Sequence, residues 1–283
     1  MTASYIQGGV RDPSVVEFYR YPPAQREGTR HWYARTQNAV VEWVESDREQ
    51  ASFTSAGIDE TLVLVPDSAG SVHWESRDFS FPAAACCVVP AGPFRITLEQ
   101  PGICICLYSR PIRDLVSLSI NHEAYASRDK RITRVVPMQR IRRPGEVAVL
   151  PMGDAPIIDH SRQTRMFQSA TVSVSWTEYH GPRNPRHLSP HTHSDFEQAS
   201  LVVRGKFTHH MRTPWGRDSR QWRPDRHEIT GPGSLTVFPV GLVHTVAGIG
   251  PGSHALVDIF SPPRSDYIER GYVSNAADYQ VAD

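Results

Sequence analysis

Short apolar runs separated by turn residues recur along almost the whole chain. Runs of this length are typical of buried β-strands. They cover residues 39–43, 61–65, 85–89 and 103–108 in the first half, and 170–176, 200–203, 234–238 and 255–260 in the second. Turn signals such as Pro66-Asp67 and Pro251-Gly252 stand between them. The pattern predicts an all-β chain whose halves are joined by a connecting segment.

Helical periodicity is rare, and the best helix candidate is residues 110–119, directly after the last strand predicted in the first half. The composition agrees with a β-rich chain, because the 283 residues include 19 glycines and 23 prolines, which turns require. Hydrophobic residues make up 39% and charged residues 21%. These values are typical of a globular protein, and the length fits one large domain or two small ones.

Charge and cysteine content exclude several classes of protein. Lys and Arg total 30, and so do Asp and Glu, so no excess of positive charge is available to bind nucleic acid or an anionic membrane. The N-terminus lacks the apolar core of a signal peptide, and no apolar run is long enough to span a bilayer. Cys86, Cys87, Cys104 and Cys106 lie in apolar runs, which indicates buried thiols rather than disulfides or a zinc site. We therefore expect a cytoplasmic protein without nucleic-acid or membrane partners.

Residues suited to bind a metal ion cluster in the second half. His191 and His193 are two residues apart, so on a strand both imidazoles lie on one face and can reach one metal ion. A strand pattern over 233–238 is followed by a Pro239-Val-Gly241 turn and then by His244. Imidazole is a suitable ligand for iron, zinc, copper and nickel. The two stretches together predict a site with three histidines.

These stretches resemble the two motifs of the cupin superfamily. Each fixed position of the second motif is matched, by Gly233, Pro239, Gly241 and His244. The first motif is matched by His191, His193 and Gly205, with Gln198 at the position of its carboxylate. The resemblance implies jelly-roll or barrel domains and one metal ion inside the second barrel.

Under this resemblance the metal is held by His191, His193, His244 and a fourth ligand. Gln198 has the family spacing, whereas Glu197 is chemically the better ligand because it is anionic. We favour Gln198 and keep Glu197 as the alternative. A neutral fourth ligand leaves the full dipositive charge on the metal, which favours an anionic chelating substrate. Fe(II) is the expected ion, with Mn(II), Ni(II) and Zn(II) as alternatives, and no organic cofactor is expected because nucleotide-binding motifs are absent from the sequence.

The first half resembles a degenerate copy of the second. Glu60 would stand at the position of the cupin acid, Phe53 and Ser55 at the two paired histidine positions, and Arg95 at the third. Such residues cannot hold a metal. The resemblance implies a bicupin with a degenerate N-terminal cupin domain at 1–115, a linker at 116–155, and a metal-binding C-terminal cupin domain with a tail at 156–283. The degenerate half is expected to pack against the other half or to form the interface of a homodimer.

Further candidates lie on the strands of the second half. Alternation places Phe207, His209 and Met211 on one face, so His209 is either a pocket acid or base or a core histidine with satisfied hydrogen bonds. Asp258 shares a face with apolar residues, where it orients a metal-bound histidine or takes an ordinary hydrogen bond. Phe207, Met211 and Phe238 are expected to line the substrate pocket. The segment 206–231 is either a lid over the barrel or a solvated hairpin.

Three functions are consistent with these residues. The leading hypothesis is a cupin dioxygenase, an oxidoreductase that acts with O2 on a small enolic or phenolic substrate that chelates the metal. A role as a tailoring enzyme of specialised metabolism follows only by analogy. The second hypothesis is a non-redox isomerase, cyclase, epimerase or lyase, which would turn over without O2. The third is a metal-containing bicupin that binds a ligand without turnover.

Overall fold

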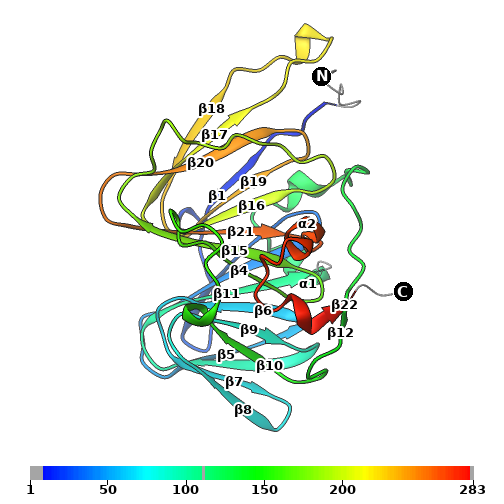
Figure 1. The fold of residues 1–283 in the computed structure, drawn as a ribbon. Coiled ribbons are helices and arrows are strands. Elements are labelled where there is room, and N and C mark those ends of the chain that lie inside the picture. The colour runs from blue at the N-terminus through cyan, green and yellow to red at the C-terminus, as the bar shows by residue number, and fades with distance from the viewer. Residues whose placement is uncertain (1–8, 110–111, 281–283) are drawn as a thin grey trace.

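The chain folds into two stacked halves built almost entirely from β-strands (Figure 1). The computed structural model describes residues 9–109 and 112–280. The prediction of an all-β chain is confirmed. Residues 1–8, part of the N-terminus that was compared with a signal peptide, lie outside the described residues.

The first half consists of two facing sheets with the strand orders β13-β9-β6-β11-β4-β3-β2 and β5-β10-β7-β8. Its own strands are β2 (Ala24–Arg26), β3 (Thr29–Arg35), β4 (Ala39–Ser46), β5 (Ala51–Gly57), β6 (Thr61–Val65), β7 (Gly70–Trp74), β8 (Arg77–Phe81), β9 (Ala85–Val89), β10 (Gly92–Leu98) and β11 (Gly102–Ser109). Buried side chains of both sheets, among them Phe53, Val72 and Ile96, pack together between them. The interior of this barrel is therefore largely apolar.

The second half repeats this arrangement with sheets of strand order β1-β19-β16-β21-β15-β14 and β18-β17-β20. Its strands are β14 (Arg165–Gln168), β15 (Ser173–His180), β16 (Gln198–Arg204), β17 (Lys206–Arg212), β18 (Arg226–Thr230), β19 (Ser234–Phe238), β20 (Val243–Ile249) and β21 (Ser253–Phe260). Where the first half has β5, this half has a segment that meets β20 only at an isolated pair, His191 with His244. The segment predicted as a lid or a solvated hairpin forms the hairpin β17–β18.

The halves exchange strands. β1 (Ser14–Glu17), at the start of the chain, pairs with β19 of the second half, and β13 (Ala148–Pro151), in the connecting segment, pairs with β9 of the first. A further pair joins β12 (Gln139–Arg140) to β22 (Tyr279–Gln280) near the C-terminus. The start of the chain therefore completes the larger sheet of the second half, and the connecting segment completes that of the first. The domain boundaries at 115 and 156 stay a prediction, because these strands cross them.

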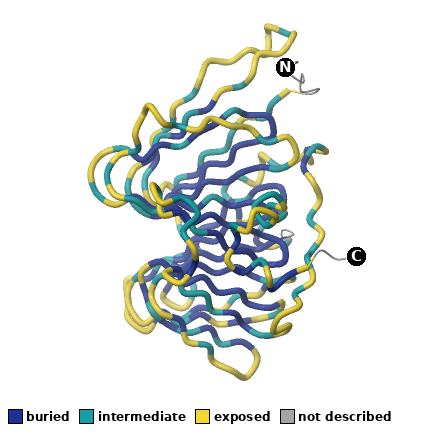
Figure 2. Tube along the Cα trace, viewed as in Figure 1, coloured by how far each residue is buried: buried dark blue, intermediate teal, exposed yellow. Residues whose placement is uncertain are grey.

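The two larger sheets pack face to face and bury one shared core. It includes Trp43, Leu62 and Ile105 from the first half, and Phe167, Leu201 and Val257 from the second. Figure 2 shows this buried layer between the halves. Successive residues of β16 point to opposite faces of its sheet. Ala199 and Leu201 belong to the shared core, so Gln198 and Ser200 face the interior of the second barrel.

Helices are few and short. They are α1 (Arg113–Leu118), α2 (Ser265–Glu269) and the 3-10 turns η1 (Phe18–Arg20), η2 (His122–Tyr125), η3 (Met152–Asp154), η4 (Ser219–Gln221) and η5 (Ala276–Asp278). The helix predicted at 110–119 corresponds to α1, and its first two residues lie outside the described part. Among the described residues, no helix combines the length and apolarity needed to cross a membrane.

Candidate metal centre

Three histidines converge inside the second barrel. His191 and His193 lie on the segment between β15 and β16, and His244 lies on β20. The backbones of His191 and His244 exchange two hydrogen bonds of 3.0 and 2.9 Å, and the N–H of Gly241 donates to the carbonyl of His193 at 2.8 Å. The ligand nitrogens of the three imidazoles all lie within 4.8 Å of one another. This spacing suits a single metal ion.

The hydrogen bonds of these histidines decide which nitrogens are free. Nδ1 of His191 lies 2.9 Å from the carbonyl of Ser189, and Nδ1 of His244 lies 3.0 Å from the carbonyl of Leu242. A carbonyl only accepts, so each Nδ1 carries the proton and donates it. The Nε2 atom of each ring then carries a free lone pair. Nε2 of His244 is buried and has no hydrogen-bond partner. This is the arrangement in which outer hydrogen bonds orient imidazoles toward a metal.

Gln198 adds a fourth acceptor to this group. Its Oε1 lies 3.0 Å from Nε2 of His193 and 3.4 Å from Nε2 of His191. This oxygen and Nε2 of His191 are both hydrogen-bond acceptors, and no proton lies between them. Their lone pairs repel each other unless a cation binds between the two atoms. The residues present therefore fit a metal ion.

Burial keeps two of these imidazoles, those of His193 and His244, neutral. Desolvation lowers the pKa of His244 to about 3 and that of His193 to about 4. Neither ring is therefore an imidazolium near neutral pH: Nε2 of His244 has a free lone pair, whereas Nε2 of His193 donates its proton to Oε1 of Gln198 and would bind a metal ion once that proton moves to Nδ1.

Glu197, the alternative fourth ligand, lies elsewhere. It precedes Gln198 and belongs to the opposite face, where its carboxylate accepts from the backbone N–H of Gln37 at 2.7 Å and from the hydroxyl of Tyr125 at 3.3 Å. The side chain is 6% exposed, and burial raises its pKa to about 7. The structure thus brings Gln198, and not Glu197, to the three histidines.

A cavity of about 50 Å³ adjoins His191, His244 and Gln198. Of the residues expected near the metal, Phe207 and Asp258 line it. Asp258 lies deep in the barrel but is partly open to the cavity, and it accepts a hydrogen bond from Ser200. Burial raises its pKa. A carboxyl group that holds its proton more tightly than usual therefore faces this space.

The comparisons with known proteins bear on the fold. A scan against protein-family models found no match, and neither did a search of curated proteins. Among solved structures, oxalate decarboxylase from Lactobacillus farciminis matches with a TM-score of 0.61 at 13% identity, over 91% of this chain and 88% of that one. A variant of the Bacillus subtilis oxalate decarboxylase OxdC matches with a TM-score of 0.60 at 12% identity, over 91% and 79%. The chain has the bicupin fold. AerE from Microcystis aeruginosa also matches, with a TM-score of 0.57 at 10% identity, over 90% of this chain and 99% of that one.

Other residues predicted in this bicupin's site lie beside the cavity rather than on it. Phe238 stacks on His244 with ring centroids 4.1 Å apart, and Met211 packs with Phe238. His209 is fully buried, and its Nε2 lies 2.9 Å from the hydroxyl oxygen of Thr230. Its Nδ1 has no partner among the described residues, and burial lowers its pKa to about 4. His209 is thus a neutral interior histidine on β17, the strand that pairs with the β20 strand of His244.

Two cationic residues of the cavity were not predicted from the sequence. Arg162 and Arg183 both line it. Arg183 donates to the carbonyl of Val246 at 2.6 Å and to the hydroxyl of Ser189 at 3.0 Å. Both arginines lie in loops, where no periodicity indicates the direction of a side chain. No sequence signal was available to find them.

The first barrel carries different residues at the positions of the metal site. Strand register places Thr61 at the position of Gln198, since Thr61 pairs with Val89 before Pro90, and Gln198 pairs with Phe238 before Pro239. Phe53 and Ser55 of β5 face the barrel interior: Phe53 is buried in its core, and the hydroxyl of Ser55 lies 2.6 Å from that of Tyr108. Arg95 follows Pro90 by five residues, as His244 follows Pro239, but its side chain is exposed on the outside of the barrel.

The prediction for Glu60 is wrong by one residue. Glu60 corresponds to Glu197 and faces away from the barrel interior. Its carboxylate accepts from the backbone N–H of Ala170 at 2.9 Å and from the hydroxyl of Tyr279 at 2.8 Å. A one-residue shift moves a strand residue to the other face, which is why Thr61 faces the interior and Glu60 does not.

Proposed function

We propose that this bicupin is an Fe(II) dioxygenase that acts with O2 on a small enolic or phenolic substrate that chelates through two oxygens. The observation that carries the proposal is the convergence of lone pairs from three imidazoles and one amide, with no carboxylate among the ligands. Fe(II) in such a set would keep its full charge and open positions at which a chelating substrate and O2 exchange electrons. A tailoring role stays an analogy.

The cavity supports a small anionic substrate. Arg183 supplies positive charge, and its hydrogen bonds to backbone and side-chain oxygens fix its position. Arg162 also lines the cavity and forms an ion pair with Asp159 at 2.8 Å. Phe207 and Leu256 form an apolar wall that excludes water from the substrate. Ser200 donates to Asp258 and so holds that carboxyl against the cavity, beside Gln198. The cavity volume of about 50 Å³ favours a substrate of few atoms.

A non-redox enzyme is the second candidate, and Asp258 is the observation that favours it. A carboxyl group on the cavity wall is placed to give or take a proton as substrate bonds rearrange. The structures with this fold include Bacillus subtilis oxalate decarboxylase, a protein with Mn(II) centres. In this alternative a metal such as Mn(II) or Zn(II) polarises a substrate carbonyl, and turnover is independent of O2.

Nitric oxide binding to the anaerobic, Fe(II)-loaded protein tests the proposal. Nitric oxide occupies the position of O2, so electron paramagnetic resonance should show a high-spin iron–nitrosyl signal in the wild type. His191→Ala should lose both bound iron and signal. His180→Ala, which removes an exposed histidine from the end of β15, is the matched control and should keep both. Stoichiometric iron without a signal would overturn the dioxygenase and favour the non-redox enzyme, and a wild type that binds no metal would overturn both.

We also propose a cytoplasmic location, which agrees with four cysteines that are all free and buried. A homodimer stays a prediction, and sedimentation analysis of the purified chain would test it.

A further inference from the structure

A second, larger cavity lies outside the metal centre. Its volume is about 310 Å³, near the lower end for small-molecule sites, and none of its lining residues lines the cavity at the histidines. Four parts of the chain build it: the segment before and at the start of β1, the turn around η2, the ends of β16 and β19, and the loop before β18, which contributes Arg223. The pocket therefore exists only because the N-terminal segment crosses over to the second half.

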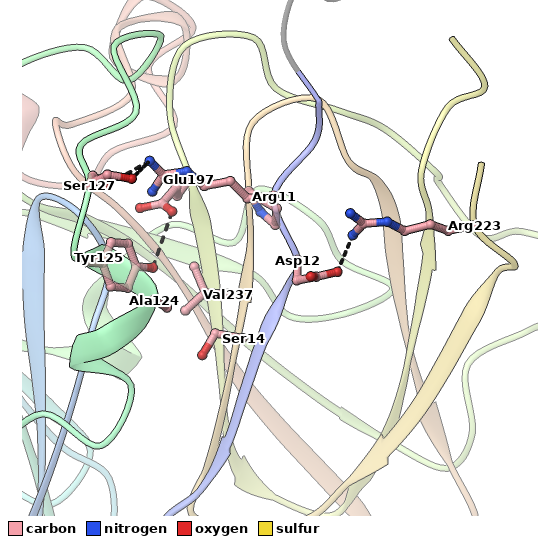
Figure 3. Close-up of a pocket in the computed structure, with 10 residues that line it drawn as sticks. Arg11, Asp12, Ser14, Ala124, Tyr125, Ser127, Glu197, Arg223 and Val237 are labelled. Atoms are coloured by element: carbon pink, nitrogen blue, oxygen red, sulfur yellow. Dashed lines mark hydrogen bonds and ion pairs between the residues drawn. The ribbon is translucent and has the colours of Figure 1, made fainter. Parts of the chain in front are cut away.

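Two polar groups on one side of this pocket have unused hydrogen-bonding capacity (Figure 3). Arg11 donates from Nη2 to the carbonyl of Ser127 at 2.7 Å and its Nε lies 3.8 Å from a carboxylate oxygen of Asp129, while its Nη1 has no partner among the described residues. Glu197 is buried and forms no ion pair within the described part of the chain. The hydroxyl of Tyr125 donates to Oε1 of Glu197 over 3.3 Å, which leaves that oxygen able to accept another hydrogen bond.

The rest of the pocket limits the charge of a ligand. Arg223 and Asp12 form an ion pair at the opposite side, with side chains 44% and 76% exposed (Figure 3). With Arg11 and Glu197, the lining holds two guanidinium groups and two carboxyl groups. Neither a dianion nor a dication is favoured by such a balanced set. Ala124, Val237 and Pro239 supply a small apolar wall.

We propose that this pocket binds a small zwitterion, namely a free amino acid with a short apolar side chain. The carboxylate of the ligand would pair with the partly exposed guanidinium group of Arg11, and its ammonium group would donate to Oε1 of Glu197. The apolar side chain would lie against Val237 and Pro239. Binding needs no metal ion and none of the three histidines.

Calorimetric titration of the metal-free wild type with L-alanine, L-valine and L-threonine tests this. At least one should bind, and isovalerate and isobutylamine, which each carry one of the two charged groups of valine, should bind at least about tenfold more weakly than valine. Arg11→Ala and Glu197→Gln should each weaken binding of the amino acid by about tenfold or more. Arg11 lies outside regular secondary structure and is partly exposed, so its removal leaves the sheets intact.

His191→Ala is the control, because it removes the metal site and should leave the affinity for the amino acid unchanged. The proposal is overturned if no amino acid binds below about 1 mM, if the half-ligands bind as well as the whole, or if binding disappears in His191→Ala and persists in Arg11→Ala and Glu197→Gln. These outcomes are independent of iron–nitrosyl formation, so failure here is distinguishable from failure of the proposed function.

Discussion

The two barrels of this bicupin share one fold and differ in what fills them. The second has three histidines, Gln198 and a cavity. In the first, Phe53, Ser55 and Thr61 face an interior that is largely apolar. β5 pairs with β10 over its whole length, whereas the histidine segment meets β20 at one pair. Pairing and packing therefore hold the first barrel together, and the second keeps a less regular edge where a ligand ion fits.

The first barrel nevertheless contains a buried polar network. Glu42 accepts from Nδ1 of His31 at 2.8 Å, from Tyr33 at 2.7 Å and from Tyr108. The hydroxyl of Thr29 donates to the carbonyl of Arg26, so it accepts the 2.7 Å hydrogen bond from Nε2 of His31. Both nitrogens of His31 thus donate, and the pair is an imidazolium with a carboxylate. The first barrel satisfies its interior charge with an ion pair of its own, and the second has acceptors that await a cation.

Removing the carboxylate should break the first barrel most strongly. Glu42→Ala leaves a buried imidazolium without a counter-ion, a change that typically costs about 3–5 kcal/mol in the free energy of unfolding. Urea denaturation measures this loss. Glu123→Ala, at an exposed position, should change stability by less than about 0.5 kcal/mol. Equal effects of the two substitutions would show that the network does not support the fold.

Loss of one histidine should break the second barrel's site. His244→Ala is expected to weaken metal binding at least about 100-fold, equivalent to about 2.7 kcal/mol, because a buried lone pair is removed. Metal content measured after dialysis, and the rise in Tm on adding Fe(II), should both fall to near zero. Arg95→Ala, at the corresponding position of the first barrel, should leave both unchanged. Retained metal in His244→Ala would refute the assigned site.

Variants of Gln198 and Glu197 test which of the two residues is the fourth ligand of the metal site. Gln198→Ala should weaken metal binding by about tenfold, since one of four acceptors is lost. Glu197→Gln should leave the affinity unchanged, because its carboxylate bonds to Gln37 and Tyr125 instead. Competition with a fluorescent chelator gives both affinities. If both variants bind like the wild type, the site consists of the three histidines alone.

Lowering the pH should reduce the free energy of unfolding of the first barrel, because Glu42 becomes protonated. Burial raises the pKa of this carboxyl, but the hydrogen bonds and charge of His31, with the hydrogen bonds from Tyr108 and Tyr33, outweigh burial and lower it below 4.5. The folded state then binds fewer protons than the unfolded state, so the stabilisation is present above pH 4.5 and is lost as pH falls. Between pH 5 and pH 3 the unfolding free energy of the wild type should fall more steeply than that of Glu42→Gln, by at most about 1.4 kcal/mol per pH unit. Identical slopes would contradict the ion pair.

Much of the fold and the histidine cluster could be predicted from the sequence because both depend on local spacing. His191 and His193 are two residues apart in an extended segment, so both reach the same ion, and a Pro239-Val-Gly241 turn brings the chain to His244. The choice between Gln198 and Glu197 was harder, since neighbouring residues point to opposite faces and one step of register reverses the answer. The same one-step error misplaced Glu60 in the first half.

The sequence by itself determined the strands, the turns and the three converging histidines of this bicupin. Only the tertiary structure decided the strand exchange, the arginines of the small cavity, the ion pair of Glu42 with His31 and the pocket that joins Arg11 to Glu197. The residues of that pocket lie far apart along the chain, with Arg11 bonded to a residue 116 positions away. Alternation and turn chemistry act over a few residues, whereas contacts of this kind are set by how whole sheets pack.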